Sequence, residues 1–336
     1  MRNNSGTTVG AFTGQTLQAI QTALNGLGAG VFTTGNIYVL DPLNGSDFSG
    51  DGSFDKPVQT LAAAYALCVT GNNDVVLLVG NGLTTATARL SAGFTWAKNA
   101  THLIGMAAPV MVSQRARIAP TTAVIAFTPF FTVSGNGCVF QNIQWFMGFA
   151  LGIANQIGMV VSGGRNFFKN CSIQGIVDDD SVSGDSAGSR SLKITSTGEN
   201  VFEDCTIGAD TRARSTSNAT LEFAAGTARN VFRRCIFPFF TDNAGVLGIV
   251  ATGNASMDRW QTFEDCQFIN AVKSTSTTMT VLASCTTASP GGMLLFNTPT
   301  VLVGITDYGD ANALSNSFIR QSGASAATEG IAIAPS

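Results

Sequence analysis

Apolar and polar residues follow a repeating pattern along the middle of this chain. Five segments share it: a Phe, two residues, a small apolar residue, one residue, and a further apolar residue. The Phe residues are separated by 28, 34, 30 and 31 residues. The five segments are Phe140–Trp145, Phe168–Ile173, Phe202–Ile207, Phe232–Phe237 and Phe263–Phe268. Self-similarity at this period is typical of a repeat architecture.

The pattern within one repeat is that of two short strands joined by one extra residue. In the third repeat, Phe202, Cys205 and Ile207 are predicted to point inward and Glu203 and Thr206 outward. The extra residue breaks the two-residue alternation of a strand, so the chain must bend there. The bend residues are Asn142, Asn170, Asp204, Arg234 and Asp265. Asn and Asp tolerate the left-handed conformation that such a bend requires, and Arg is the exception.

These repeats resemble the right-handed parallel β-helix of the pectate-lyase-like superfamily, in which each coil contributes parallel strands and Asn often occupies a tight bend. The resemblance implies an all-β solenoid over residues 37–300. It extends to a strand-like stretch at Ile37–Asp41 and to a short helix at Thr60–Leu67, which we expect to cap the first coil. We expect residues 1–36 to form an N-terminal arm with a short amphipathic helix, and residues 301–336 a C-terminal cap or extended tail.

Stacked coils place equivalent residues in columns, and successive residues of one column lie about 4.8 Å apart. Two columns are predicted to lie in the core. They are Phe140, Phe168, Phe202, Phe232 and Phe263, and, after the bend, Ile143, Cys171, Cys205, Cys235 and Cys266. An outward column alternates in charge: Lys169, Glu203, Arg233 and Glu264. The bend column alternates again at Asp204, Arg234 and Asp265.

We interpret these charges as a ladder that sets the register of the coils. Unlike charges on neighbouring strands stabilise a sheet by about 0.2–1 kcal/mol per pair, and register is otherwise weakly specified on a polar face. The alternative is that Glu203, Asp204, Glu264 and Asp265 are paired carboxylates for acid–base catalysis. Their basic neighbours in the same columns favour the structural interpretation.

The composition of the chain limits the kinds of molecule that we expect it to bind. Charged residues make up 12% of the chain, against about 25% in typical soluble domains, and the net charge is −3. The sequence has no basic tract, which argues against nucleic acid. It has neither a signal-peptide pattern nor an apolar stretch long enough to span a membrane, so we expect no membrane association. A surface with so few charges favours contact with other subunits, and the resemblance to viral β-helix proteins implies a homotrimer.

Candidate chemistry is sparse. The seven Cys include no Cys-x-x-Cys pair and are expected to be reduced, and His102, the only histidine, is expected to be a core or hydrogen-bonded residue rather than a general base. The acidic run Asp178–Asp180 could bind calcium, but a solvated loop tip is the commoner explanation for such a run. Pectate lyases use Asp ligands for calcium and an Arg as base, and Arg234 between Asp204 and Asp265 is the nearest match. We therefore predict no catalytic, cofactor-binding or metal-binding residues, no cofactor, and a protein that is not an enzyme.

The functional prediction is a bacteriophage virion structural protein, assembled in the host cytoplasm. Its partners would be other copies of itself and the major capsid protein, as expected of a trimeric head decoration or cement protein. One alternative is a tail-associated receptor-binding protein or a tailspike polysaccharide depolymerase. A secreted polysaccharide lyase or hydrolase is a third possibility.

Overall fold

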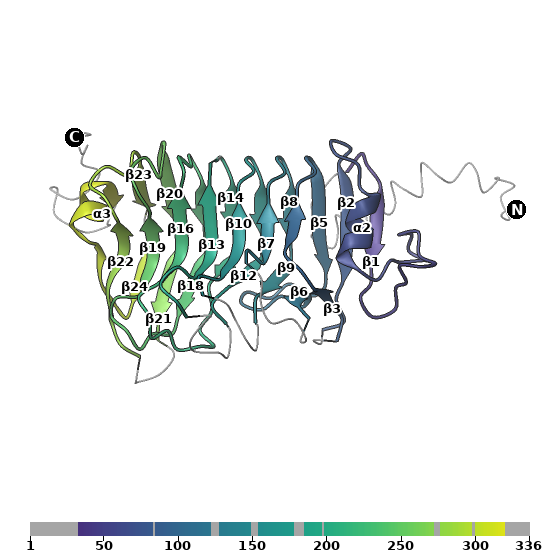
Figure 1. Ribbon diagram of the computed structural model, residues 1–336, viewed down its shortest axis with the longest axis horizontal. Helices are drawn as coiled ribbons and strands as arrows, with labels where there is room; N and C mark the ends of the chain where they lie inside the picture. The colour runs from purple at the N-terminus through teal and green to yellow at the C-terminus, as the bar shows by residue number, and fades with distance from the viewer. Residues whose placement is uncertain are drawn as a thin grey trace, which may run out of the picture.

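Three parallel sheets wrap around one continuous apolar core in a right-handed parallel β-helix, the fold predicted from the sequence (Figure 1). The computed structural model describes residues 33–82, 85–121, 128–148, 154–177, 185–196, 198–271, 276–297 and 300–319. The predicted N-terminal helix and the acidic run at residues 178–180 lie outside these ranges.

Sheet I has ten strands and contains the Phe residues of the repeats. Its strands, in spatial order, are β1 (Ile37–Leu40), β2 (Asp74–Val79), β5 (Thr101–Met106), β8 (Val139–Gln141), β11 (Phe167–Lys169), β14 (Val201–Glu203), β17 (Val231–Arg233), β20 (Trp260–Glu264), β23 (Met293–Asn297) and β26 (Ser317–Ile319).

Sheets II and III have eight strands each. Sheet II contains β3 (Thr87–Leu90), β6 (Ala116–Pro120), β9 (Ile143–Phe146), β12 (Ser172–Gln174), β15 (Thr206–Ile207), β18 (Ile236–Phe239), β21 (Gln267–Asn270) and β24 (Val301–Val303). Sheet III contains β4 (Phe94–Trp96), β7 (Phe131–Val133), β10 (Ile157–Val161), β13 (Arg190–Thr195), β16 (Ala219–Ala224), β19 (Leu247–Ala251), β22 (Met279–Cys285) and β25 (Ile305–Gly309).

A single residue turns the chain from sheet I into sheet II in each repeat. This residue has a positive φ in all five repeats, from 50° at Asn170 to 56° at Asn142, and Arg234 adopts it too, at 52°. The side chain of Asn170 donates a hydrogen bond to the Asn142 amide oxygen at 2.8 Å, so the bend residues also bond from coil to coil.

The inward column of sheet I is an uninterrupted stack of aromatic rings. Phe168 and Phe202 are 4.6 Å apart between ring centroids, and Phe202 and Phe232 are 4.8 Å apart, with the rings parallel to within 7°. The stack begins at Phe140 and continues through Phe263 to Phe296, which lies beyond the five repeats. This arrangement buries each ring fully and gives each ring inside the stack an aromatic neighbour above and below.

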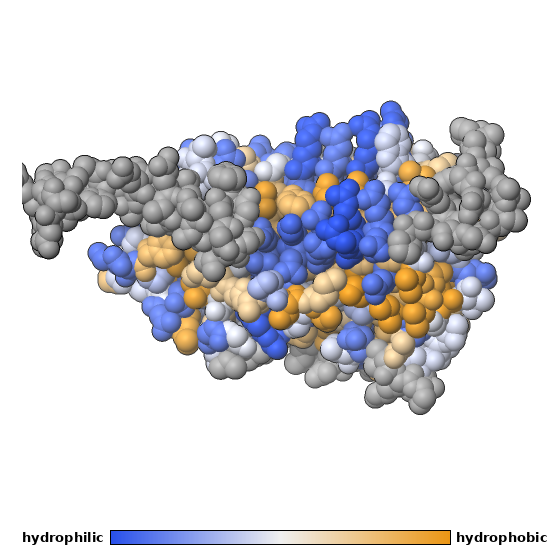
Figure 2. All heavy atoms as spheres, turned by 180° about the vertical axis from the view of Figure 1, so that it is seen from behind, coloured by the Kyte–Doolittle hydropathy of each residue, from blue (hydrophilic) through white to orange (hydrophobic). Residues whose placement is uncertain are grey.

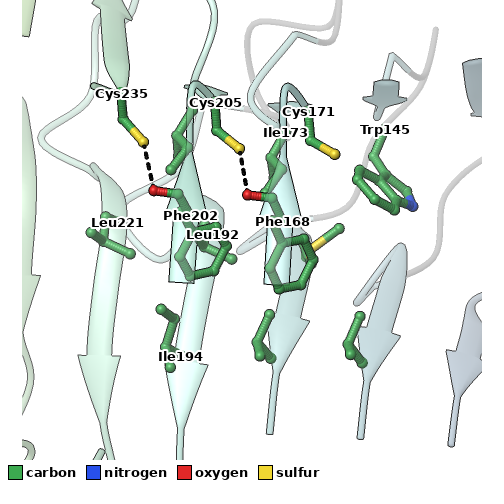
Figure 3. Packing of buried hydrophobic residues seen from close by; sticks show 14 of the residues in the cluster. Trp145, Phe168, Cys171, Ile173, Leu192, Ile194, Phe202, Cys205, Leu221 and Cys235 are labelled. Carbon is green, nitrogen blue, oxygen red and sulfur yellow. Dashed lines mark hydrogen bonds between the residues drawn. The ribbon is translucent and has the colours of Figure 1, made fainter. Parts of the chain in front are cut away.

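The cysteines that follow the bend donate hydrogen bonds between coils. The thiol of Cys205 donates to the carbonyl oxygen of Phe168 at 3.4 Å, and that of Cys235 donates to the Phe202 carbonyl at 3.3 Å (Figure 3). Cys171 and Cys266 repeat this contact. All seven cysteines are free and buried, so these positions combine a small apolar side chain with a weak donor.

A short helix covers the first coil. In α2 (Leu61–Leu67), Thr60 is the N-cap, and its hydroxyl accepts a hydrogen bond from the Ala63 amide. Leu61 and Ala64 are buried against the core, which closes its N-terminal end. Within the described ranges no helix is long and apolar enough to cross a membrane.

The β-helix extends past residue 300, where the sequence placed its end. Strands β24, β25 and β26 pair in parallel with β21, β22 and β23, and the short helix α3 (Ala311–Ser315) lies between the last two strands. These residues lack the Phe-x-x-Cys signature, and among the described side chains the aromatic stack ends at Phe296.

Candidate functional site

The predicted charge ladder lies on the outer side of sheet I and its bend. Lys169, Glu203, Arg233 and Glu264 are in register on adjacent strands. Glu203 contacts both neighbours, Lys169 and Arg233, at 3.4 Å, and Arg233 binds Glu264 at 2.7 Å. The ladder is therefore held together by ion pairs between successive coils.

Ion pairs join only part of the bend column. Arg234 forms an ion pair with Asp204 at 2.7 Å and with Glu203 at 3.1 Å. Within the described residues, no ion pair links Arg234 to Asp265. Each acidic residue that could be read as catalytic, apart from Asp265, is thus held by a cation of a neighbouring coil.

His102 is a hydrogen-bonded residue of sheet I. Its ring nitrogen Nδ1 accepts a hydrogen bond from the Val139 amide at 3.0 Å, and its side chain is buried. Burial lowers the pKa of His102, with the charge of Asp74 acting in the opposite direction. The neutral ring therefore satisfies a backbone donor.

The outer face of sheet II changes character along the helix axis. One column of outward residues runs through all eight strands in register. Its members are Thr87, Arg117, Gln144, Ser172, Thr206, Ile236, Gln267 and Val301. The N-terminal members are polar or charged, and apolar residues predominate from Ile236 onward.

The middle of this face is covered by residues 107–115, which we call the strap. The Val112 carbonyl accepts hydrogen bonds from Ser172 Oγ at 2.8 Å and Gln174 Nε2 at 3.0 Å. The Met111 carbonyl accepts one from Thr206 Oγ1 at 2.6 Å. The strap satisfies the polar side chains of β12 and β15 with its backbone and leaves its own apolar side chains exposed.

The C-terminal end of the same face is an apolar strip, which we define as Ile236, Ile269, Val301 and Val303. Val301 and Val303 are 42% and 39% exposed. Figure 2 shows apolar side chains gathered low on the C-terminal half of the molecule, where Figure 1 places β18, β21 and β24. No described element packs over these two valines, and exposed apolar patches of this kind often mark contact sites.

A buried charged cluster lies on the outer face of sheet III, and the sequence analysis did not identify it. Glu222 accepts a hydrogen bond from Arg190 Nε at 2.8 Å, from Lys193 Nζ at 2.8 Å and from Thr252 Oγ1 at 2.9 Å. Leu221 and Phe223, on either side, are in the core, so Glu222 points outward from β16. The Glu222 cluster was hidden because its members are far apart in sequence and lie outside the repeated segments.

Electrostatics favour the ionised form of the Glu222 carboxylate. Burial acts to raise the pKa of Glu222, but the hydrogen bond from Lys193 and the charges of Arg190 and Lys193 outweigh it and hold the pKa below its usual value. Nearby, burial lowers the pKa of Arg214 to about 9, with Asp185 opposing the shift. A carboxylate held in this way is suited to orienting a bound group or bracing the sheet, and unsuited to donating a proton at neutral pH.

A buried amide ladder is a second feature that the sequence analysis missed. Asn200 Nδ2 donates to Asn230 Oδ1 at 3.0 Å, and Asn230 Nδ2 donates to Gln261 Oε1 at 2.8 Å. Each of these residues stands two positions before a Phe of the aromatic stack, as does Asn166. The recurrence of Asn at that position was the available signal.

The described residues contain no group of three or more His, Cys, Asp or Glu side chains that could hold a metal ion. In the nearest match to a pectate-lyase calcium site, Arg234 pairs with Asp204, and among the described residues no ion pair joins it to Asp265.

Comparisons with known proteins support the fold. No protein-family model and no curated protein sequence matches the chain. Among solved structures, it is similar to a pectate lyase, with a TM-score of 0.52 and 16% identity over 80% of this chain and 63% of that one. It is also similar to a pectin methylesterase in complex with a hexasaccharide, with a TM-score of 0.51 and 17% identity over 83% of this chain and 81% of that one. A protein of Geobacillus virus E2, ORF18, is similar at a TM-score of 0.42 and 12% identity over 87% of this chain and 63% of that one.

These likenesses correct one expectation. The sequence analysis predicted that the chain is not an enzyme, because familiar catalytic motifs are missing. That prediction is wrong as argued, since the solved structures with the same fold include a pectate lyase and pectin methylesterases. Missing local motifs therefore do not exclude catalysis in a parallel β-helix. The chain spans less than two thirds of the pectate lyase, and at 16–17% identity the likeness shows the shared fold alone.

Proposed function

We propose that this chain is a bacteriophage virion protein that assembles as a homotrimer and docks on other virion proteins, as a head decoration or cement protein does on the major capsid protein. The observation that carries the proposal is the apolar strip on sheet II. A regular sheet surface with two exposed valines on the same face of β24 suits a permanent interface between subunits, because such interfaces are rich in apolar residues.

The low charge of the chain supports the same proposal. Only 12% of its residues are charged, and many of the described charges pair with one another in ladders. A surface of this kind offers little electrostatic repulsion to a second copy.

The loop at residues 41–56 supports docking at the N-terminal end. Phe48 is fully exposed, and Leu43 and Phe54 are each 52% exposed. The loop is tied to the residues that follow it, because Asp47 Oδ1 accepts hydrogen bonds from the Gln59 and Thr60 amides at 2.7 and 2.9 Å. A rigid loop that presents an exposed aromatic ring is suited to filling an apolar pocket on a partner.

Sedimentation equilibrium tests the trimer. The double variant Val301→Asp with Val303→Asp is expected to dissociate to monomers while its far-UV circular dichroism stays that of the wild type, because charges are costly in an apolar interface. Thr280→Asp, at an exposed position of β22 on sheet III, is the matched control and is expected to remain trimeric. A monomeric wild type, or a double variant that remains trimeric, contradicts this part of the proposal.

Binding to particles that lack the chain tests docking. Phe48→Ser is expected to weaken this binding, whereas Val69→Ser, at an exposed apolar residue on another loop, is expected to leave it unchanged. Equal binding by the wild type and the Phe48 variant would argue against the loop as the docking element.

A second candidate is a tail-associated protein that binds or cleaves a glycan. It is favoured by the fold shared with a pectate lyase and by the Glu222 cluster on the outer face of sheet III. Clearing of host lawns, or binding on a glycan array, that is lost in Glu222→Gln and kept in Glu199→Gln would support it. The absence of both activities in the wild type would argue against it.

A further inference from the structure

We propose that Arg89, Arg115 and Arg117 form a binding site for an oxyanion, a phosphate or carboxylate group carried by a ligand. The proposal is independent of the virion role. It concerns the N-terminal end of the outer face of sheet II, at the opposite end from the apolar strip.

The fold brings the three arginines together. Arg117 on β6 is in register with Thr87 on β3, and Arg89 lies two residues beyond Thr87 on the same strand. Their neighbours in sequence, Ala88, Ala116 and Ile118, are in the core. Arg89 on β3 and Arg117 on β6 must therefore point outward, because side chains alternate along a strand.

The backbones of these arginines lie close together compared with the length of an arginine side chain. Strands about 4.8 Å apart and a rise of about 3.3 Å per residue place the backbones of Arg89 and Arg117 roughly 8 Å apart. Arg115 lies two residues before Arg117, at the end of the strap, and is close enough for its positive charge to act on Arg117. The three guanidinium groups can thus converge on one anion.

Neutral groups hold two of the three arginine side chains in place. Arg117 Nε donates to Gln144 Oε1 at 2.7 Å, and its guanidinium lies over the Phe146 ring, 5.0 Å from the centroid. Arg89 Nη1 donates to the Pro120 carbonyl oxygen at 2.8 Å. These contacts orient the side chains and leave their charges uncompensated.

No carboxylate among the described residues neutralises this cluster. None of the ion pairs formed within that part of the chain includes any of the three arginines. Burial lowers the pKa of Arg117, and the positive charges of Arg115 and Arg89 lower it further. Like charges at this range repel one another, and a bound anion would remove that repulsion.

The contrast with the rest of the molecule makes the cluster informative. Elsewhere, stacked charges alternate in sign: Arg165 and Arg229 flank Glu199 at 2.8 and 2.7 Å, and Lys169 and Arg233 flank Glu203. Charges in a column fix the register of stacked coils only when they alternate in sign. Register control therefore does not explain three arginines in one place. Guanidinium groups match the two oxygens of a carboxylate or phosphate, which explains them directly.

Titration calorimetry of the full chain with inorganic phosphate, and separately with acetate, tests the site. We expect saturable binding of at least one of the two, and a loss of affinity of tenfold or more in the double variant Arg89→Gln with Arg115→Gln. This pair leaves Arg117, which packs on Phe146, in place and so protects folding. Arg259→Gln, which removes an exposed arginine paired only with Asp258, is the matched control and should bind like the wild type.

Several results would overturn the proposal. They are the absence of saturable binding of both anions, unchanged affinity in the double variant, and an equal loss in the Arg259 control, which would indicate general charge screening. A double variant that changes the sedimentation of the protein without changing anion affinity would also overturn it, because the arginines would then serve a contact between subunits. The comparison of phosphate with acetate identifies which of the two anions the site prefers.

Discussion

Replacing Phe202 tests how much the aromatic stack stabilises the β-helix. The ring of Phe202 is fully buried and lies between Phe168 and Phe232 at 4.6 and 4.8 Å. Phe202→Leu keeps most of the apolar volume but loses two stacked neighbours, each worth about 0.5–1.5 kcal/mol beyond area burial, for a total of about 1–3 kcal/mol. Phe202→Ala also leaves a cavity and is expected to cost about 3–5 kcal/mol.

Denaturant unfolding followed by circular dichroism measures these changes in stability. If unfolding is irreversible, the unfolding rate replaces the free energy, because weaker packing in the native state speeds unfolding. Phe48→Leu is the matched control: its ring is fully exposed, and a change within about 0.5 kcal/mol is expected. Equal effects of the Phe202→Leu and Phe48→Leu substitutions would refute the reasoning that the stack stabilises the fold.

Three further predictions concern titratable groups. Burial raises the pKa of the Cys205 thiol well above its usual value, and all seven thiols are buried, so a thiol reagent should label none in the native protein and all seven after unfolding. Labelling of a native thiol would contradict the packing described here. Glu222→Gln leaves two largely buried cations without a carboxylate and should lower stability by about 3–5 kcal/mol, with a smaller loss for Glu199→Gln at an exposed ladder position. The pKa of His102 is lower in the folded than in the unfolded chain, so its contribution to stability is complete above about pH 6.5 and is lost as the pH falls below that value. Urea midpoints measured against pH should show this fall in the wild type and a shallower one in His102→Asn.

The repeats allowed the fold to be predicted because one local rule recurs in each coil. The extra residue between Phe202 and Cys205 forces a bend, and a bend of one residue requires a positive φ, which Asp204 adopts. Arg234 is not one of the residue types preferred at such a bend, yet it also has a positive φ, since the neighbouring coils in the stack determine the path of the chain. Local chemistry and stacking thus agree at these positions, which is why the repeats, together with the resemblance that they carry, were sufficient to predict the fold.

The end of the β-helix could not be predicted in the same way. The last strands, β24 to β26, carry no Phe-x-x-Cys segment, so nothing in the sequence distinguishes them from a tail. Their place is determined by parallel pairing with the preceding coil, which is a long-range property.

The candidate sites also depend on long-range register. Arg89 and Arg117 belong to early coils without the repeated signature, and their proximity follows from the pairing of β3 with β6. The Glu222 cluster likewise joins residues of β13 and β16 with Thr252, at the end of β19. By contrast, the position of Asn two residues before the stacked Phe is visible in sequence, and the buried amide ladder could have been predicted from it.

Quantitative mass spectrometry of purified particles tests the central proposal most directly. The number of copies of this chain is compared with that of the major capsid protein in the same particles. A head decoration or cement protein predicts a copy number in fixed proportion to the capsid lattice and of the same order as that of the capsid protein. A few copies per particle would assign the chain to the tail, and its absence from particles would contradict the virion role.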